Sequence, residues 1–156
     1  MIETKAFFKP YGDSAAEENE RLQKEEKEFR EAIRINPNDA EARSNLGILL
    51  YKLARYDEAE KEYEEVVRIN PGDAKAHSIL GFLLNRLTRY DDAEKEFREV
   101  IRINPNDADA HTNLGILLND LKRYEESVKE FREVIRIDPN DADAYTILGK
   151  LLKDLK

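Results

Sequence analysis

Hydrophobic and polar positions follow a pattern that returns along the chain at a fixed interval. The segment 98–107 reads REVIRINPND and recurs almost unchanged at 132–141, with earlier versions at 30–39 and 64–73. Each segment carries a proline, and each of these prolines lies 34 residues after the one before it: Pro37, Pro71, Pro105 and Pro139. A period of this length is typical of proteins built from stacked repeats. The sequence therefore predicts a solenoid.

Within each repeat, apolar residues three and four positions apart predict two helices. The first helix follows an aspartate that we expect to be its N-cap residue: Asp39, Asp73, Asp107 or Asp141. In the first repeat this helix is expected over about 40–53, with a buried side made of Ala42, Leu46, Leu49, Leu50 and Leu53. The second helices are expected over about 58–69, 92–103 and 126–137.

Two of the second helices begin with the spacing of a capping box, in which two side chains each bond a backbone N–H of the other residue. Asp57 with Glu60 has this spacing, and the same pair recurs at 91 and 94. The third repeat has Glu125 and Val128 at these positions. We therefore expect its second helix to start more weakly.

The ends of the chain differ from the repeats. Ser14 and Glu17 form another capping box, so a helix is expected from about Ala15 to Ile35, because the residue before Pro37 is disfavoured in helical geometry. The expected organisation is a tail over 1–13 followed by a repeat domain over 14–156. This domain comprises a lone helix (14–39), three full repeats (40–73, 74–107 and 108–141) and a C-terminal capping helix (142–156).

A glycine recurs inside each predicted first helix, at Gly47, Gly81, Gly115 and Gly149. A glycine in a helix interior destabilises it by about 1 kcal/mol relative to alanine. Close approach of the second helix explains why this is tolerated, because any side chain would collide there. The large residues expected to fill the space beside these glycines are Tyr56, Tyr90 and Tyr124 together with Tyr63, Phe97 and Phe131.

Composition narrows the classes of partner and compartment. A net charge of −8 argues against general binding to nucleic acid or to an anionic membrane, which requires clustered Lys and Arg. The absence of cysteine excludes disulfides and thiolate metal sites, and fits a reducing compartment. The sequence also contains no apolar run of signal-peptide or membrane-spanning length. We therefore expect a cytoplasmic protein.

The residues at fixed positions of each repeat resemble the tetratricopeptide (TPR) pattern of Leu-Gly, Ala, an aromatic residue and Pro. One repeat carries Leu80, Gly81, Ala93, Phe97 and Pro105 at these positions. The resemblance covers 40–156, while 14–39 resembles a second helix alone. The opening aromatic of the pattern is replaced in the three full repeats, by Arg43, His77 and His111.

This resemblance implies an all-α, right-handed solenoid of stacked helix-turn-helix repeats. The first helix of each pair would line a concave groove that holds a peptide or a partner helix. It also implies a scaffold without catalysis and without a cofactor. TPR domains that bind chaperone tails hold a carboxylate with Lys, Asn, Asn, Lys and Arg. In one register those positions hold Ser44, Ile48, Ile79, Asp109 and Asn113, and starting one repeat later a single asparagine matches, so that specialisation is not expected.

The candidate binding residues are those that the resemblance places in the groove. They are Ser44, Asn45, Ile48, Lys52, Lys75, Ser78, Ile79, Phe82, Asn85, Arg86, Asp109, Thr112, Asn113, Ile116, Asn119 and Asp120. An apolar line, Ile48–Phe82–Ile116, runs where a solvated face would be polar, and exposed apolar patches usually mark interaction sites. The alternative is that these residues only pack within the superhelix, or that the tail over 1–13 covers them. Apart from Glu41, the charged residues at two groove positions divide by repeat: Lys52, Lys75 and Arg86 lie in the first two repeats, and Asp109, Asp120, Asp143 and Asp154 lie further along the chain. We therefore expect the groove to be positive at its N-terminal end and negative at its C-terminal end.

Catalytic and metal chemistry find little support in the sequence. His77 and His111 are the only histidines, and they occupy the same position in adjacent repeats. A zinc site needs three or four ligands, so a packing role is the better interpretation. The chain has no phosphate-binding loop, HExxH or calcium-loop motif. We expect neither an enzyme nor a metal site.

The function expected from these observations is protein or peptide binding in the groove. Two alternatives remain. One is a structural module that self-associates through its terminal helices, because 142–155 resembles a first helix without its second and 14–36 a second helix without its first. The other is a consensus-like engineered repeat without a natural ligand, which the near-identity of the repeats would fit.

Overall fold

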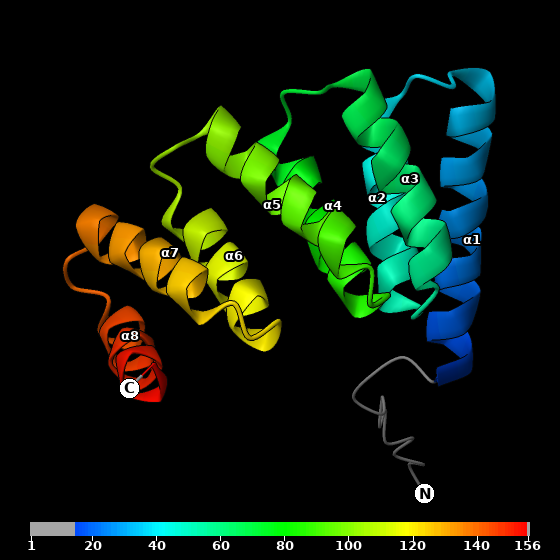
Figure 1. The fold of residues 1–156 in the computed structure, drawn as a ribbon. Coiled ribbons are helices and arrows are strands. Elements are labelled where there is room, and N and C mark those ends of the chain that lie inside the picture. Colours follow the sequence, from blue (N-terminus) through cyan, green and yellow to red (C-terminus); the bar gives the residue numbers. More distant parts are fainter. Residues whose placement is uncertain (1–14, 156) are drawn as a thin grey trace, which may run out of the picture.

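The computed structural model describes residues 15–155, and this part of the chain consists of α-helices without a strand (Figure 1). The helices are α1 (Ala15–Ile35), α2 (Ala40–Lys52), α3 (Tyr56–Ile69), α4 (Ala74–Arg86), α5 (Tyr90–Ile103), α6 (Ala108–Asp120), α7 (Tyr124–Ile137) and α8 (Ala142–Asp154). Each packs against the next in sequence, most extensively within the pairs α2–α3, α4–α5 and α6–α7. The predicted all-α solenoid is confirmed. The tail over 1–13 and the capping box of Ser14 lie outside the described residues.

The aspartate caps of the first helices are confirmed. Asp39 accepts a hydrogen bond from the backbone N–H of Ala42 at 2.9 Å. Asp73, Asp107 and Asp141 make the same bond at the start of α4, α6 and α8. Each cap satisfies a backbone donor that the helix itself leaves unpaired.

The capping boxes predicted for the second helices are wrong. α3 begins at Tyr56, two residues earlier than expected, and its N-cap residue, Arg55, makes no capping bond with its side chain. α5 and α7 begin in the same way, so the third repeat does not differ from the others at this point. Asp57 lies inside the first turn instead, where its negative charge still favours the positive end of the helix dipole.

The early start follows from the turn between the two helices. Ala54 adopts a left-handed conformation with φ 57°, and the amide of Arg55 donates to the carbonyl of Leu50 at 2.9 Å. This is a Schellman turn, which ends one helix and aims the chain directly into the next. Thr88 and Lys122 have the same conformation in the next two repeats. None of the three is glycine, so the sequence predicted a short turn here but did not signal its left-handed residue.

The glycine of each full repeat lies against an aromatic ring of its second helix, as predicted for Tyr63, Phe97 and Phe131, while the nearest atoms at these glycines include none of Tyr56, Tyr90 or Tyr124. A Cβ added at Gly47 would lie 2.6 Å from Cε2 of Tyr63. The corresponding closest distances are 2.6 Å from Gly81 to Phe97 and 2.9 Å from Gly115 to Phe131. At Gly149 no described atom would lie within 4 Å of that Cβ, because α8 has no second helix packed on this face.

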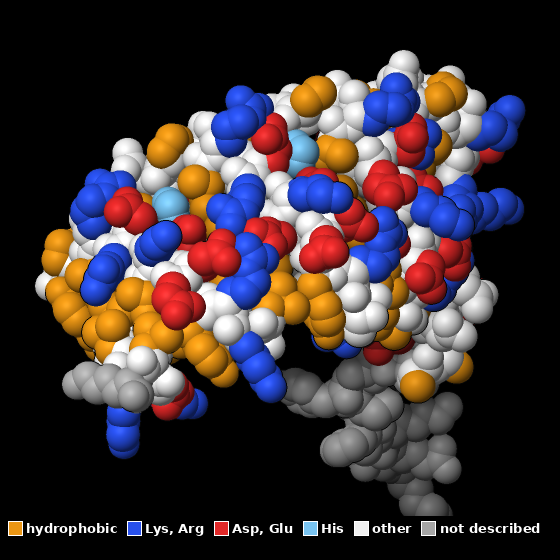
Figure 2. Space-filling model, in the orientation of Figure 1, with side chains coloured by type: hydrophobic (Ala, Val, Ile, Leu, Met, Phe, Trp, Pro, Cys, Tyr) orange, Lys and Arg blue, Asp and Glu red, His pale blue; other side chains and the backbone are white. Residues whose placement is uncertain are grey.

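Arginine–carboxylate bonds link the second helices to one another. Arg55 donates to Glu26 of α1 at 2.7 Å and to Glu58 of its own helix at 2.7 Å. Arg123 makes the corresponding bonds to Glu94 and Glu126, and Arg89 bonds Glu60 and Asp92. Lys, Arg, Asp and Glu side chains are interspersed over this layer, as Figure 2 shows. These bonds join adjacent repeats on the side formed by α1, α3, α5 and α7.

The carboxyl pKa values of two equivalent glutamates in this layer, Glu60 and Glu94, are shifted in opposite directions. Burial opposes ionisation of Glu94, but hydrogen bonds from Arg123 and Arg98 outweigh it, and the pKa of its carboxyl is lowered. Burial raises the pKa of the Glu60 carboxyl, against the opposing charge of Arg89. One helical turn after Glu60, α3 has Glu64 where α5 has Arg98, so the local charge changes sign.

We expect Gly81→Ala to lower the free energy of unfolding and Gly149→Ala to raise it. The methyl group of Gly81→Ala would collide with the ring of Phe97, which is buried and has little room to move. The methyl group of Gly149→Ala meets no described atom, so it only improves helix propensity, by about 1 kcal/mol. Urea unfolding compares the two variants. Equal stabilisation by both would show that close packing does not require Gly81.

The two glutamates should also differ in how their stability contribution depends on pH. Because the pKa of Glu94 is lowered in the fold, its ionised form stabilises the protein above the usual carboxyl pKa, and this is lost as pH falls through the folded pKa. Glu94→Gln should therefore lower stability at neutral pH by about 1 kcal/mol, with the difference closing in acid. Glu60→Gln should lower it less, because the raised pKa means that ionisation of Glu60 opposes folding above the usual pKa, although Arg89 bonds this carboxyl. Urea unfolding at several pH values tests this, and identical pH profiles for the two variants would contradict it.

Candidate functional site

An apolar cleft of about 390 Å³ opens between α2 and α4, and we call it the α2–α4 cleft. Its lining comprises Ile48, Tyr51, Lys52, Tyr63, Ile79 and Phe82. Phe82 is 46% exposed and Ile48 is 40% exposed, although both lie on well-packed helices. The ring of Phe82 stands edge-on to the buried ring of Phe97, with centroids 5.5 Å apart, which fixes where it projects. The cleft therefore presents rigid apolar surface to solvent.

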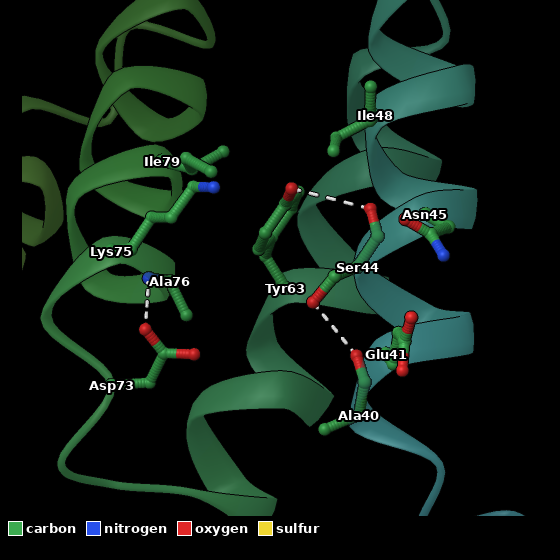
Figure 3. A pocket seen from close by; sticks show the side chains of 10 residues that line it. All are labelled: Ala40, Glu41, Ser44, Asn45, Ile48, Tyr63, Asp73, Lys75, Ala76 and Ile79. Atoms are coloured by element: carbon green, nitrogen blue, oxygen red, sulfur yellow. Dashed lines mark hydrogen bonds between the residues drawn. The ribbon is translucent and has the colours of Figure 1, made fainter.

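The cleft continues into a more polar cavity of about 350 Å³ toward the start of α2 (Figure 3). Ile48, Tyr63 and Ile79 line both parts. Within residues 15–155, the structure gives the side chains of Asn45 and Lys75 no hydrogen-bond partner, so their polar groups are available to a ligand. This part of the groove can bond a peptide backbone beside the apolar part.

Tyr63 forms the base of both parts. Its hydroxyl donates to the backbone carbonyl of Ser44 at 3.4 Å, as Figure 3 shows. Burial raises the pKa of the Tyr63 phenol to about 12, so the group stays protonated near neutral pH. The hydroxyl of Ser44 donates to the carbonyl of Ala40 at 2.8 Å, so its proton serves the helix rather than a ligand.

Aromatic rings and a guanidinium group lie at the other end of the cleft. The Cζ atom of Arg86 lies 4.5 Å from the ring centroid of Tyr56, and one of its nitrogens donates to the Tyr56 hydroxyl at 3.0 Å. The rings of Tyr51 and Tyr56 meet edge-on with centroids 5.3 Å apart. Tyr51 thus connects this cluster to the cleft that it lines.

The structure brings only some of the predicted groove residues together. The cleft and its polar extension gather Ser44, Asn45, Ile48, Lys52, Lys75, Ile79 and Phe82. Ile116 and Asn119 line a separate cavity of about 150 Å³ beside α8. The other predicted residues line neither site: Ser78, Asn85, Arg86, Asp109, Thr112, Asn113 and Asp120. The expected apolar line is therefore divided between two cavities.

Tyrosines of this region were assigned differently from the sequence. Tyr63 and Tyr56 were expected only to pack beside the glycine. The signal for Tyr63 was its hydroxyl, since the equivalent residues of the next two repeats are Phe97 and Phe131.

Both histidines have structural partners, in line with the expected packing role. His77 lies 2.6 Å from Glu96 through Nδ1 and 3.0 Å from the carbonyl oxygen of Pro71 through Nε2. His111 repeats these contacts with Glu130 and Pro105. Arg43 makes the corresponding pair in the first repeat, to Glu62 and Pro37. All three side chains thus tie the second helix to the loop that precedes the first.

The described part of the chain offers neither a metal cluster nor a membrane span. No three His, Asp or Glu side chains there lie close enough to hold a metal ion. None of the helices over 15–155 is long and apolar enough to span a bilayer.

The terminal helices bear on self-association. Tyr145 and Leu152 of α8, with Leu155 directly after it, are exposed on a face that in the full repeats receives a second helix. Glu25 of α1 stands at the position of Ala59, whose side chain is completely buried. If α1 completed a repeat with α8 of a second copy, it would bury this carboxylate beside Arg21, whose Nε lies 3.8 Å from it, and burying charged groups is costly. This cost disfavours the predicted self-association through α1 and α8.

Comparisons with known proteins agree with this fold. Two family models, both described as tetratricopeptide repeat, match residues 19–81 and 80–142. The comparison with curated proteins finds no match.

Several solved structures are similar to the chain. The crystal structure of MamA has a TM-score of 0.80 at 19% identity, covering 92% of this chain and 85% of that one. The crystal structure of YrrB has a TM-score of 0.74 at 22% identity, covering 86% and 69%. The first TPR of Spaghetti (RPAP3), bound to an HSP90 peptide, has a TM-score of 0.68 at 23% identity, covering 74% and 92%. Identities this low show a shared fold alone. Together with the two family models, the repeated helix pairs and their glycine–aromatic contacts establish that this chain belongs to the tetratricopeptide repeat family.

Proposed function

We propose that this protein-interaction scaffold binds an extended peptide, or a short helix of a partner protein, along its first helices. The α2–α4 cleft takes an apolar anchor side chain of the ligand. The single observation that carries this proposal is the exposure of Phe82 and Ile48 over a cleft lined almost entirely by apolar atoms. Because the interior of the fold is otherwise well packed, apolar surface left open on rigid helices is best explained by a ligand.

Similar proteins support the proposal by analogy. The first TPR of Spaghetti (RPAP3) is bound to the HSP90 peptide SRMEEVD, and YrrB is described as a TPR protein with an unusual peptide-binding site. The family is generally non-enzymatic, which agrees with a binding role. The residues that would bind a ligand here are argued from this chain alone.

The chemistry of the cleft suits a peptide. Ile48, Ile79 and Phe82 offer apolar walls, while Asn45 and Lys75 offer a donor or acceptor to a neighbouring backbone amide. Burying one large apolar side chain contributes about 1.5–3 kcal/mol. The anchor would therefore set affinity, and the polar groups would set the position of the chain beside it.

We expect Phe82→Ala to weaken binding of a peptide selected on the parent protein from a random library by about ten- to a hundredfold, because it removes one wall of the cleft. The loss should persist at high salt, since the contact is apolar. Isothermal titration calorimetry measures the affinity, and thermal unfolding checks that the variant is folded.

The matched control is Lys61→Ala, on an exposed position of α3 in the opposite layer, which should bind the same peptide like the parent. A peptide that binds Phe82→Ala as tightly as the parent would show that the cleft is not the site.

A further inference from the structure

Two basic side chains lie at the end of the α2–α4 cleft where both helices finish. Lys52 is the last residue of α2 and Arg86 the last residue of α4, and they occupy equivalent positions of neighbouring repeats. Lys52 lines the cleft itself, and Arg86 is held against Tyr56, beside Tyr51. We call Tyr51, Lys52 and Arg86 the basic end of the cleft.

The cations of the basic end have no carboxylate partner. Most arginines in the described part of the chain form ion pairs, for example Arg55 with Glu26 and Arg123 with Glu94. Within residues 15–155, Lys52 and Arg86 form none. Arg86 is instead positioned by stacking on a neutral ring and by a bond to its hydroxyl. Its charge is therefore fixed in place and uncompensated.

The helix ends do not require these cations. A basic residue in the last turn favours the negative end of the helix dipole, which is the simplest structural explanation for both. However, α6 has Asp120 at the equivalent position and ends in the same way, with the amide of Leu121 bonded to the carbonyls of Leu117 and Asn119. Since a carboxylate is tolerated there, the helix terminus alone does not account for Lys52 and Arg86.

The groups at the basic end suit a carboxylate. An ammonium, a guanidinium and a phenol hydroxyl all supply N–H or O–H donors, and the two cations supply the opposite charge. Apolar surface adjoins them directly, because Tyr51 and Lys52 line the same cleft as Ile48 and Phe82. A ligand that fills the cleft therefore brings its neighbouring group to the basic end.

We propose that the basic end is an anion subsite for a peptide carboxylate placed next to the apolar anchor residue. This inference rests on the proposed function of the groove and names the chemistry of its ligand: an acidic peptide with a bulky apolar residue beside the acid. The carboxylate comes either from an Asp or Glu side chain or from the C-terminus of the peptide. The site lies at other positions than those with which chaperone-tail-binding TPR domains hold a carboxylate. At three of those positions this chain has Ser44, Ile48 and Ile79.

The test uses peptides selected from a random library on the parent protein, with affinities measured at low and high salt. The selected peptides should carry an acidic residue or a free C-terminus at one fixed side of the apolar anchor. Replacing the acid by its amide should weaken binding about fivefold at low salt and less at high salt. Glu→Gln exchange and amidation of the C-terminus, made separately, identify the source of the carboxylate.

A double-mutant cycle assigns the effect to the subsite. In the variant with Lys52→Gln and Arg86→Gln, the acidic peptide and its amide should bind equally. The matched control is Arg132→Gln, which changes another arginine without a carboxylate partner in the described residues, on the exposed side of α7. It should preserve the parent's preference for the acid.

The outcomes separate the two proposals. If the acid and its amide bind the parent equally while Phe82→Ala still weakens both, the subsite is refuted and the groove function stands. If the preference for the acid survives in the double variant, the carboxylate is read elsewhere and the subsite is refuted. If Phe82→Ala leaves binding unchanged, the cleft is not the site and both proposals fall.

Discussion

The contact between a first-helix glycine and a second-helix ring determines how each repeat is built. Gly47 lets Tyr63 approach so closely that an added methyl group would overlap the ring. The same ring forms the base of the α2–α4 cleft. In the next repeat Phe97 fills the space at Gly81 and also supports Phe82 edge-on. The packing that holds each helix pair together therefore also sets the depth of the groove and the direction of its main anchor.

Charged residues are used differently on the two layers of the solenoid. On the layer of second helices, arginines bond carboxylates of the preceding repeat, so their charges are compensated within the fold. In and beside the cleft and its polar extension, Lys52, Lys75 and Arg86 have no such partner among the described residues. Exposed pairs contribute at most about 1 kcal/mol each, so the first group adds modest stability. Under the proposed function, the second group would steer and orient an acidic ligand.

Much of the fold could be predicted because the same capping, glycine and aromatic residues recur every 34 residues. The aspartate caps and the glycine–aromatic contacts follow from residues such as Asp39 and Gly81. The starts of the second helices could not be predicted, because they depend on turns in which Ala54 and Thr88 adopt a left-handed conformation. That conformation usually indicates glycine, and neither residue is one. The site was predicted only as a face. Which residues share a cleft depends on how side chains of neighbouring repeats pack in three dimensions, and Ile116 lines a different cavity from Ile48.

Differences among the repeats bear on whether the groove has a ligand at all. Packing positions stay nearly constant, for example Leu at 50, 84 and 118 or an aromatic ring at 63, 97 and 131. Groove positions vary: Tyr51 becomes Asn85 and Asn119, and Lys52 becomes Arg86 and then Asp120. Stability requires the first set and leaves the second free, since an acid at position 120 ends its helix as well as a base does at 86. A chain specified only for folding would have no reason to vary the exposed helix ends from basic to acidic along one groove. This variation favours selective binding over a consensus-like repeat without a ligand, because recognition of one orientation needs unlike ends.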